Sequence, residues 1–159
     1  MLTNYHVRMP TALSVGSPRD SVFHLLRLVL QEHGARWTER ITGSSVREIT
    51  KPQYAVLRAA HIHPGLDQAA VGQFTGTDKA TVTALLDRLE RRGLLTREVH
   101  PEDRRRRTLH LTPEGEQLLD AMIPLVEQVS EELLSRLTRT EREQLVTLLG
   151  KLAGMPAPS

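Results

Sequence analysis

Four consecutive arginines, Arg104–Arg107, are the residues of this sequence that most directly indicate a chemistry. A guanidinium group stays charged at neutral pH and donates paired hydrogen bonds to phosphate oxygens. The arginines lie in a polar turn between two short alternating segments, residues 94–100 and 108–111, which predict a β-hairpin. An arginine at such a tip is attracted by the negative potential of a narrow DNA minor groove. A basic turn that merely faces solvent is the alternative, and the arginines alone do not decide between the two.

The segment before the hairpin predicts a helix from Thr77 to Gly93, with Thr77 as its N-cap. Its apolar residues recur three and four positions apart, which predicts that they face the core: Val82, Leu85, Leu86 and Leu89. The first two turns of the opposite face carry threonine and alanine, where a merely solvated helix would normally carry lysine and glutamate. Small side chains let a helix lie deep in the major groove, where threonine hydrogen-bonds base edges or contacts a thymine methyl.

We therefore predict a DNA-binding surface made by this helix and the arginine turn. Asp103 precedes Arg105 by two positions, and because phosphate repels a carboxylate, we expect Asp103 to orient that guanidinium rather than to contact DNA. The predicted contacts are Thr77, Lys79, Ala80, Thr81, Thr83 and Arg88 on the helix, with Arg104, Arg105 and Arg106 in the turn.

The other segments predict the elements that position this surface. Residues 1–18 are expected to form a flexible arm, followed by a single domain over residues 19–159. The fold class is mainly α with a small β-hairpin wing: a winged helix-turn-helix over about residues 50–112, with N- and C-terminal dimerisation helices over about residues 20–42 and 113–153. The expected helix ends are a capping box of Thr50 and Gln53, an Asp67 cap for a short helix that Gly76 closes, and Thr138 or Thr140 for the last helix.

The terminal helices themselves indicate a homodimer. They carry more Leu, Ile and Val than the small winged region can cover, and the chain offers no other layer to pack against them. Interleaving these helices between two chains would bury the apolar residues, and two helices of the recognition type would then reach successive major grooves, about 34 Å apart.

Composition excludes several classes of function. The 159 residues include no cysteine, which excludes disulfides, thiolate metal sites and cysteine-based redox sensing. No apolar run is long enough to span a bilayer, so we expect a cytoplasmic protein without membrane contact. Catalytic and phosphate-binding motifs are also missing from the sequence, and we expect neither an enzyme nor a cofactor. His61 and His63 form an HxH pair, but no third or fourth ligand stands at metal spacing, so no metal site is predicted.

The charge is distributed unevenly along the chain, although the formal net charge is only +2. Residues 88–107 hold eight arginines against four acidic residues, whereas residues 113–149 hold eight acidic residues against three arginines. A basic segment followed by an acidic helical one indicates that the basic segment forms a polyanion-binding surface, and that the acidic segment serves a separate function.

Three sequence patterns together resemble the multiple-antibiotic-resistance regulator (MarR) family over about residues 20–153. They are Gln53-x-x-x-Leu57, the helix Thr77–Gly93 with its Asp87-Arg88-Leu89-Glu90 run, and Asp103-Arg104-Arg105 followed by Leu111-Thr112-Pro113-x-Gly115. The wing pattern Asp-x-Arg followed by Leu-Thr is the most specific part of the resemblance.

The resemblance implies an obligate homodimer that binds a pseudo-palindromic DNA operator. It also implies repression that a small, often aromatic or phenolic, effector relieves. Arg105 would be the minor-groove arginine with Asp103 as its orienting partner, and Lys79, Thr81 and Thr83 would lie in the major groove. The family's effector pocket makes His24, Trp37 and Tyr54 candidate ligand contacts, although a lone tryptophan is more often a packing residue. Some relatives sense zinc through histidines and carboxylates.

Two other classes of protein share part of this pattern. An architectural DNA-binding protein would carry the same charges but show little sequence preference and no response to an effector. A winged domain that mediates protein interactions would bind duplex DNA only weakly. The threonine face argues against both, because neither function needs close access to bases.

Overall fold

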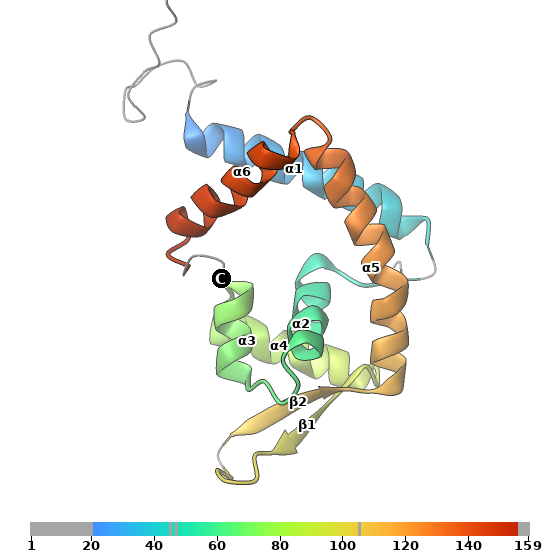
Figure 1. The fold of residues 1–159 in the computed structure, drawn as a ribbon. Helices are drawn as coiled ribbons and strands as arrows, with labels where there is room; N and C mark the ends of the chain where they lie inside the picture. Colours follow the sequence, from blue (N-terminus) through green and yellow to red (C-terminus); the bar gives the residue numbers. More distant parts are fainter. Residues whose placement is uncertain (1–20, 45, 47, 105, 156–159) are drawn as a thin grey trace, which may run out of the picture. The chain divides into compact units, whose positions relative to one another are not determined.

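The computed structural model describes residues 21–44, 46, 48–104 and 106–155. In the described residues, four helices are followed by a β-hairpin and then by two further helices, which is the predicted order (Figure 1). The helices and strands are α1 (Val22–Thr42), α2 (Lys51–Ile62), α3 (Gln68–Thr75), α4 (Lys79–Arg91), β1 (Leu95–Val99), β2 (Arg107–Leu111), α5 (Pro113–Leu134) and α6 (Arg139–Leu152). The predicted fold class, mainly α with a β-hairpin wing, is confirmed. None of the helices in the described ranges is long and apolar enough to cross a membrane.

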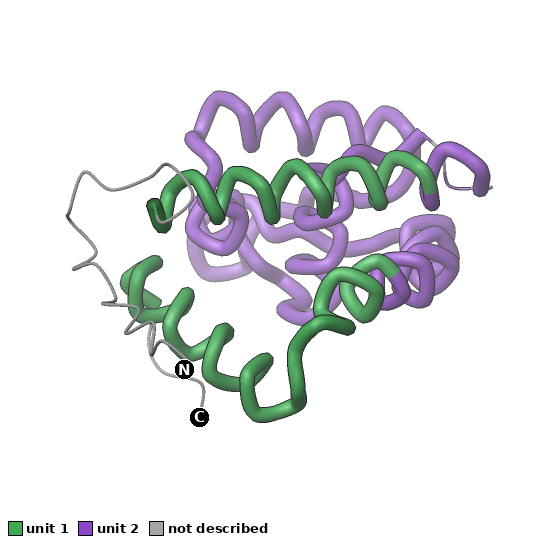
Figure 2. The backbone as a smooth tube through the Cα atoms, turned by 90° about the horizontal axis from the view of Figure 1, so that it is seen from above, with its two compact units in different colours: residues 1–39, 129–159 green, residues 40–128 purple. Residues whose placement is uncertain are grey.

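The chain divides into two compact units (Figure 2). One comprises residues 1–39 and 129–159, and the other comprises residues 40–128. The predicted arm, residues 1–18, lies outside the described residues, and the single domain over residues 19–159 stays a prediction.

The unit of residues 40–128 is a winged helix-turn-helix. Helix α3 packs against α2 and α4, and the antiparallel hairpin packs against these helices. Its interior consists of aliphatic side chains from every element, and burying such side chains is the main favourable term in folding. The fully buried ones include Val56, Leu57, Val71, Val82, Leu86, Leu89, Leu95 and Leu109. Three of the four predicted core residues of α4 are buried, and Leu85 is half-buried.

Local hydrogen bonds determine where the first helices of this unit begin. Thr50 caps α2 in the predicted capping box, in which Gln53 is itself buried. Asp67 caps α3 through the backbone N–H of Ala70, and Gly76 ends α3 in a left-handed conformation at φ 61°. Glycine adopts this conformation without the steric cost that a Cβ would bring. These three predictions are confirmed.

The N-cap of α4 differs from the prediction, which named Thr77. Asp78 caps the helix, its side chain accepting from the backbone N–H of Thr81. Thr77 instead belongs to the turn, because its backbone N–H donates to Gly72 at 3.0 Å and its hydroxyl donates to Thr75 at 3.2 Å. Threonine and aspartate are both good N-caps, and the geometry that closes α3 decides between them.

The hairpin pairs Leu95 with Leu111 and Val99 with Arg107. Leu95 and Leu109 are buried, whereas Val99, which pairs with Arg107 near the tip, remains 47% exposed. Residues 65–67 run along the other edge of β2. Leu109 donates its N–H to Leu66 and its carbonyl accepts from Gly65, at 2.9 and 3.2 Å. The base of the wing is therefore attached to the segment that leads into α3.

The remaining unit consists of helical segments. Within it, Arg36 bonds Glu32 one turn away and Glu132 on α5, at 2.8 and 3.0 Å. Thr138, one of the two predicted caps, begins α6 in a capping box with Glu141. Large apolar side chains are nevertheless exposed on both terminal helices: Phe23, Leu25, Leu28, Val29 and Leu30 on α1, and Val146, Leu148 and Leu152 on α6.

Candidate nucleic-acid interface

The outer face of α4 presents the predicted small residues to solvent. Lys79, Ala80 and Thr81 in its first turn are exposed, and so is Arg88 two turns later. Thr83 is only half-buried. The result is a helix surface with small side chains at Ala80 and Thr81 and with cations at Lys79 and Arg88, as close approach to a polyanion requires.

The hydroxyl of Thr81 already has a partner in the protein. It donates to the Asp78 carboxylate at 2.6 Å, while the other carboxylate oxygen accepts from the Thr81 backbone N–H at 3.0 Å. These hydrogen bonds, the side-chain one first, lower the pKa of Asp78. Because its only proton is used, the Thr81 hydroxyl can accept a hydrogen bond from a base amino group but cannot donate one. Its methyl group remains available for a thymine methyl.

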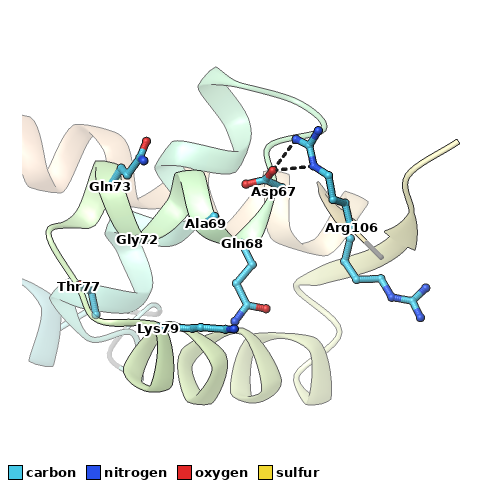
Figure 3. A pocket seen from close by; sticks show the side chains of 9 residues that line it. Asp67, Gln68, Ala69, Gly72, Gln73, Thr77, Lys79 and Arg106 are labelled. Carbon is cyan, nitrogen blue, oxygen red and sulfur yellow. Dashed lines mark hydrogen bonds and ion pairs between the residues drawn. The ribbon is translucent and has the colours of Figure 1, made fainter. Parts of the chain in front are cut away.

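The hydroxyl of Thr83 is held by a residue that the sequence analysis missed. It donates to the Lys79 carbonyl at 2.8 Å, so it must accept from the side-chain amide of Gln68, which lies at 2.5 Å. Gln68 is the first residue of α3 and extends toward α4 (Figure 3). The only sequence signal for this contact was a polar residue in the first turn of α3, the helix that positions α4, and such a residue is too common to be specific.

A groove of about 640 Å³ lies between α3, the start of α4 and the wing (Figure 3). Its lining combines cations with small or polar side chains: Asp67, Gln68, Ala69, Gly72, Gln73, Thr77, Lys79, Arg106 and Arg107. Of the predicted contacts, Thr77, Lys79 and Arg106 therefore lie on one concave surface. Arg107 belongs to the same arginine run but was not among the predicted contacts.

The arginines of the wing have different environments. Among the described residues of the wing, Arg104, Arg106 and Arg107 are all exposed, but only Arg106 of these three forms an ion pair. Arg106 forms an ion pair with Asp67, its Nε donating to the carboxylate at 3.0 Å. Arg105 lies outside the described residues, so its orientation by Asp103 stays a prediction. The backbone of Asp103 is part of the wing turn, where its carbonyl accepts from Arg106 at 2.9 Å.

Other arginines of the basic segment are engaged inside the protein. Arg97 on β1 bonds Asp87 at 2.7 Å and also Glu90, both on α4, and the hydrogen bond to Glu90 is the main cause that raises the pKa of Arg97. Arg92 donates to the backbone carbonyl of Glu48 at 3.1 Å. The count of arginines in residues 88–107 therefore overstates the charge that this surface offers to a partner.

The three candidate ligand contacts lie in different units. His24 and Trp37 belong to the unit with the terminal helices, where Trp37 is 7% exposed and its ring centroid lies 6.3 Å from that of His33. Tyr54 belongs to the winged unit and is half-buried, and burial raises the pKa of its phenol. Their role in ligand binding stays a prediction.

The HxH pair does not converge on one point. His61 pairs with Glu116 on α5 at 2.8 Å, whereas the ring of His63 lies against Phe74 with centroids 4.7 Å apart. Within the described part of the chain, no group of three or more His, Asp or Glu side chains is arranged to hold a metal ion.

Comparison with known proteins gives consistent matches. A family model described as the MarR family matches residues 48–106. The chain is 43% identical to the transcriptional regulator HosA of Escherichia coli O111:H- over 134 residues, covering 84% of this chain and 96% of HosA. It is 35% identical to the repressor NicR of Pseudomonas putida over 133 residues, covering 84% of this chain and 82% of NicR.

Two solved structures are similar over nearly their whole length. PcaV of Streptomyces coelicolor, a transcriptional regulator in complex with its natural ligand, has a TM-score of 0.79 at 33% identity, covering 89% of this chain and 98% of PcaV. BpsR of Bordetella bronchiseptica, whose DNA binding is regulated by 6-hydroxynicotinic acid, has a TM-score of 0.77 at 33% identity, covering 92% of this chain and 99% of BpsR.

Proposed function

The chain belongs to the MarR family of transcriptional regulators, and from this premise we propose that it is a homodimeric repressor that binds a pseudo-palindromic operator and is released by a small aromatic ligand. The observation that carries the proposal is the outer face of α4, where small side chains stand beside a groove lined by cations of the wing. A catalytic step has no part in this proposal, and the expected location is the cytoplasm.

Two kinds of contact divide the work of DNA recognition in this proposal. Lys79, Arg88, Arg104 and Arg107 supply positive charge for phosphates, which gives affinity and salt dependence without sequence information. Ala80 and the methyl groups of the threonines on α4 contact base edges in the major groove, which gives specificity. Arg105 enters the minor groove at the wing tip.

The proposed homodimer is supported by the apolar side chains of the terminal helices. Phe23 is 84% exposed and Leu152 is 72% exposed. Large apolar side chains exposed along both helices indicate an interaction site, and a second copy of the same chain would cover the same residues on both molecules. The resulting two-fold symmetry would match the symmetry of the operator.

The proposed effector is a planar aromatic acid or phenol. Support comes from BpsR, whose DNA binding responds to 6-hydroxynicotinic acid, and from PcaV, which has a natural ligand. His24, Trp37 and Tyr54 are the candidate contacts. Since Trp37 is the only tryptophan of the chain, its fluorescence reports ligand binding directly.

The function is tested by fluorescence anisotropy over a salt series, with duplexes from the region upstream of the chain's own gene and a shuffled control. A sequence-specific regulator should prefer its operator by a factor on the order of 10³ or more. Adding aromatic acids to the complex should then release the DNA. Equal and steeply salt-dependent binding to both duplexes would instead indicate an architectural protein, and weak binding lost at modest salt would indicate a protein-interaction module.

A further inference from the structure

We infer that Asp67 and Arg106 form a positioning pair that fixes the wing against α3 and thereby sets operator specificity, so that Arg106 does not serve as a phosphate contact. This inference rests on the proposed DNA-binding function, and it replaces the sequence-based expectation that Arg106 contacts DNA. Nothing in the spacing of the two residues, which lie 39 positions apart, indicated that they would meet.

One carboxylate performs two tasks in this arrangement. One oxygen of Asp67 accepts from the backbone N–H of Ala70 at 2.8 Å and so caps α3. The other oxygen accepts from both Nε and Nη2 of Arg106 (Figure 3). The start of the positioning helix and the wing are thus bonded to the same side chain.

The ion pair extends the backbone attachment of the wing toward its tip. Leu109 is bonded to residues 65 and 66, and Thr108 is bridged to Asp67. Arg106 lies two positions closer to the tip than Thr108. Its own backbone closes the turn, because its N–H donates to Asp103 and its carbonyl accepts from His100, at 2.9 and 3.0 Å. Holding the side chain of Arg106 therefore holds the turn that carries Arg104.

Charge and the burial of Asp67 favour retention of the pair when DNA binds, while the Arg106 side chain itself is 52% exposed. The Asp67 side chain is only 19% exposed, and losing Arg106 to a phosphate would leave this carboxylate unneutralised in a groove that faces the polyanion. The hydrogen bond from Ala70, followed by that from Arg106, outweighs the effect of burial and lowers the pKa of Asp67, so the carboxylate is charged at neutral pH. Arg104 and Arg107 are exposed and remain for the phosphates.

Asp67→Asn separates this inference from a simple effect of charge. Asparagine caps helices as well as aspartate does, so α3 keeps its N-cap while the ion pair is lost. Removing a negative charge from a DNA-facing groove should by itself tighten binding to every duplex. Loss of positioning should instead weaken binding to the preferred sequence and reduce discrimination. The two explanations predict opposite signs for the same measurement.

The experiment uses the full chain with a duplex that the wild type selects from a random pool, and a shuffled duplex as control. Asp67→Asn, Arg106→Gln and the double variant are compared with Arg107→Gln, which changes the neighbouring arginine. Circular dichroism melts check that each variant folds. The measured quantities are the Kd for the shuffled duplex divided by the Kd for the selected duplex, and the slope of log K against log salt for each duplex.

We expect Asp67→Asn and Arg106→Gln each to lower the Kd ratio by about tenfold, and the double variant to lower it no further, because both act through one contact. Arg106→Gln should leave the salt slope of wild type unchanged. Arg107→Gln should reduce the slope by roughly 1.8 per dimer, at about 0.9 per lost phosphate contact.

Two results would overturn the inference. One is an equal loss of salt slope in Arg106→Gln and Arg107→Gln, since it would make Arg106 a phosphate contact. The other is tighter binding of Asp67→Asn to both duplexes with an unchanged ratio, which would leave only a charge effect. A wild type that selects no sequence from the pool would overturn the proposed function itself, and this inference with it.

Discussion

The side-chain amide of Gln68 donates to the hydroxyl of Thr83 at 2.5 Å, and this hydrogen bond joins the two helices of the helix-turn-helix. The Thr83 hydroxyl donates its hydrogen bond to the Lys79 carbonyl, so it can only accept a hydrogen bond from Gln68. The orientation of the amide follows, with Nε2 toward α4 and the carbonyl oxygen left for another donor. A residue of the positioning helix thereby fixes a side chain on the recognition helix.

Removing either partner of this hydrogen bond should weaken the packing of α3 on α4. We expect Gln68→Ala and Thr83→Val each to lower the free energy of unfolding by about 1 kcal/mol, with the double variant costing less than the sum. Urea denaturation at fixed protein concentration measures the free energy of unfolding of the two single variants and of the double variant. Gln73→Ala, a change of the same type in the same helix, is the control and should stay within about 0.5 kcal/mol of wild type. Strict additivity of the two changes would show that the pair does not interact.

The N-cap of α4 can be assigned by paired substitutions at adjacent positions. Asp78→Ala should destabilise the protein by about 1 kcal/mol, whereas Asp78→Asn should be close to neutral because asparagine also caps. Thr77→Ala should cost less than Asp78→Ala, since the Thr77 hydroxyl bonds only a turn carbonyl at 3.2 Å. Thermal melts of the three variants provide the measurement, and the reverse order would restore Thr77 as the cap.

Gly115 near the start of α5 should not tolerate a side chain. A Cβ built there would lie 2.0 Å from the Leu94 carbonyl oxygen, a backbone atom that cannot move without displacing the start of the hairpin. We expect Gly115→Ala to destabilise by more than about 3 kcal/mol or to prevent folding. Gly150→Ala in α6 is the matched control, because its Cβ meets no atom within 4 Å. That change should stabilise α6 by about 0.5–1 kcal/mol. Soluble yield and denaturation midpoints distinguish the two.

Arg105→Ala should weaken binding to the operator by about 1–3 kcal/mol if this arginine enters the minor groove. The effect should be larger on the operator than on a shuffled duplex, because the potential of the groove depends on its sequence. Anisotropy at a fixed salt concentration measures the change. Unchanged affinity for the operator would remove Arg105 from the interface.

Acid should weaken the N-terminus of α6 through Glu141. Hydrogen bonds from Thr138, the backbone one first, lower the pKa of Glu141 in the folded protein. A depressed folded-state pKa contributes stability above the unfolded value, and this contribution is lost as the pH falls below about 4.3. Glutamine also fits a capping box, so Glu141→Gln keeps the cap but cannot titrate. We expect the stability of wild type to fall relative to Glu141→Gln between neutral and acidic pH. Parallel pH profiles of the two proteins would contradict the assignment.

Most helix ends, and the helix expected to contact DNA, could be predicted from the order of residues alone. The capping box at Thr50 and the cap at Asp67 join residues three positions apart, and the buried stripe of α4 repeats every three or four. For the last helix the sequence left Thr138 and Thr140 as alternatives, and the structure has the cap at Thr138. Interactions of such short range are set by the order of residues, because the helix geometry fixes which neighbours meet.

Which charges and amides remain available to a partner depends on contacts between distant segments, which the sequence does not show. Arg106 meets Asp67 across 39 positions, Arg97 on β1 meets Asp87 on α4, and Gln68 reaches Thr83 on the next helix. The sequence displays a run of arginines without showing which are already bonded. Such pairing depends on the segments that the packed core brings together, and a side chain bonded inside the fold offers less to a partner.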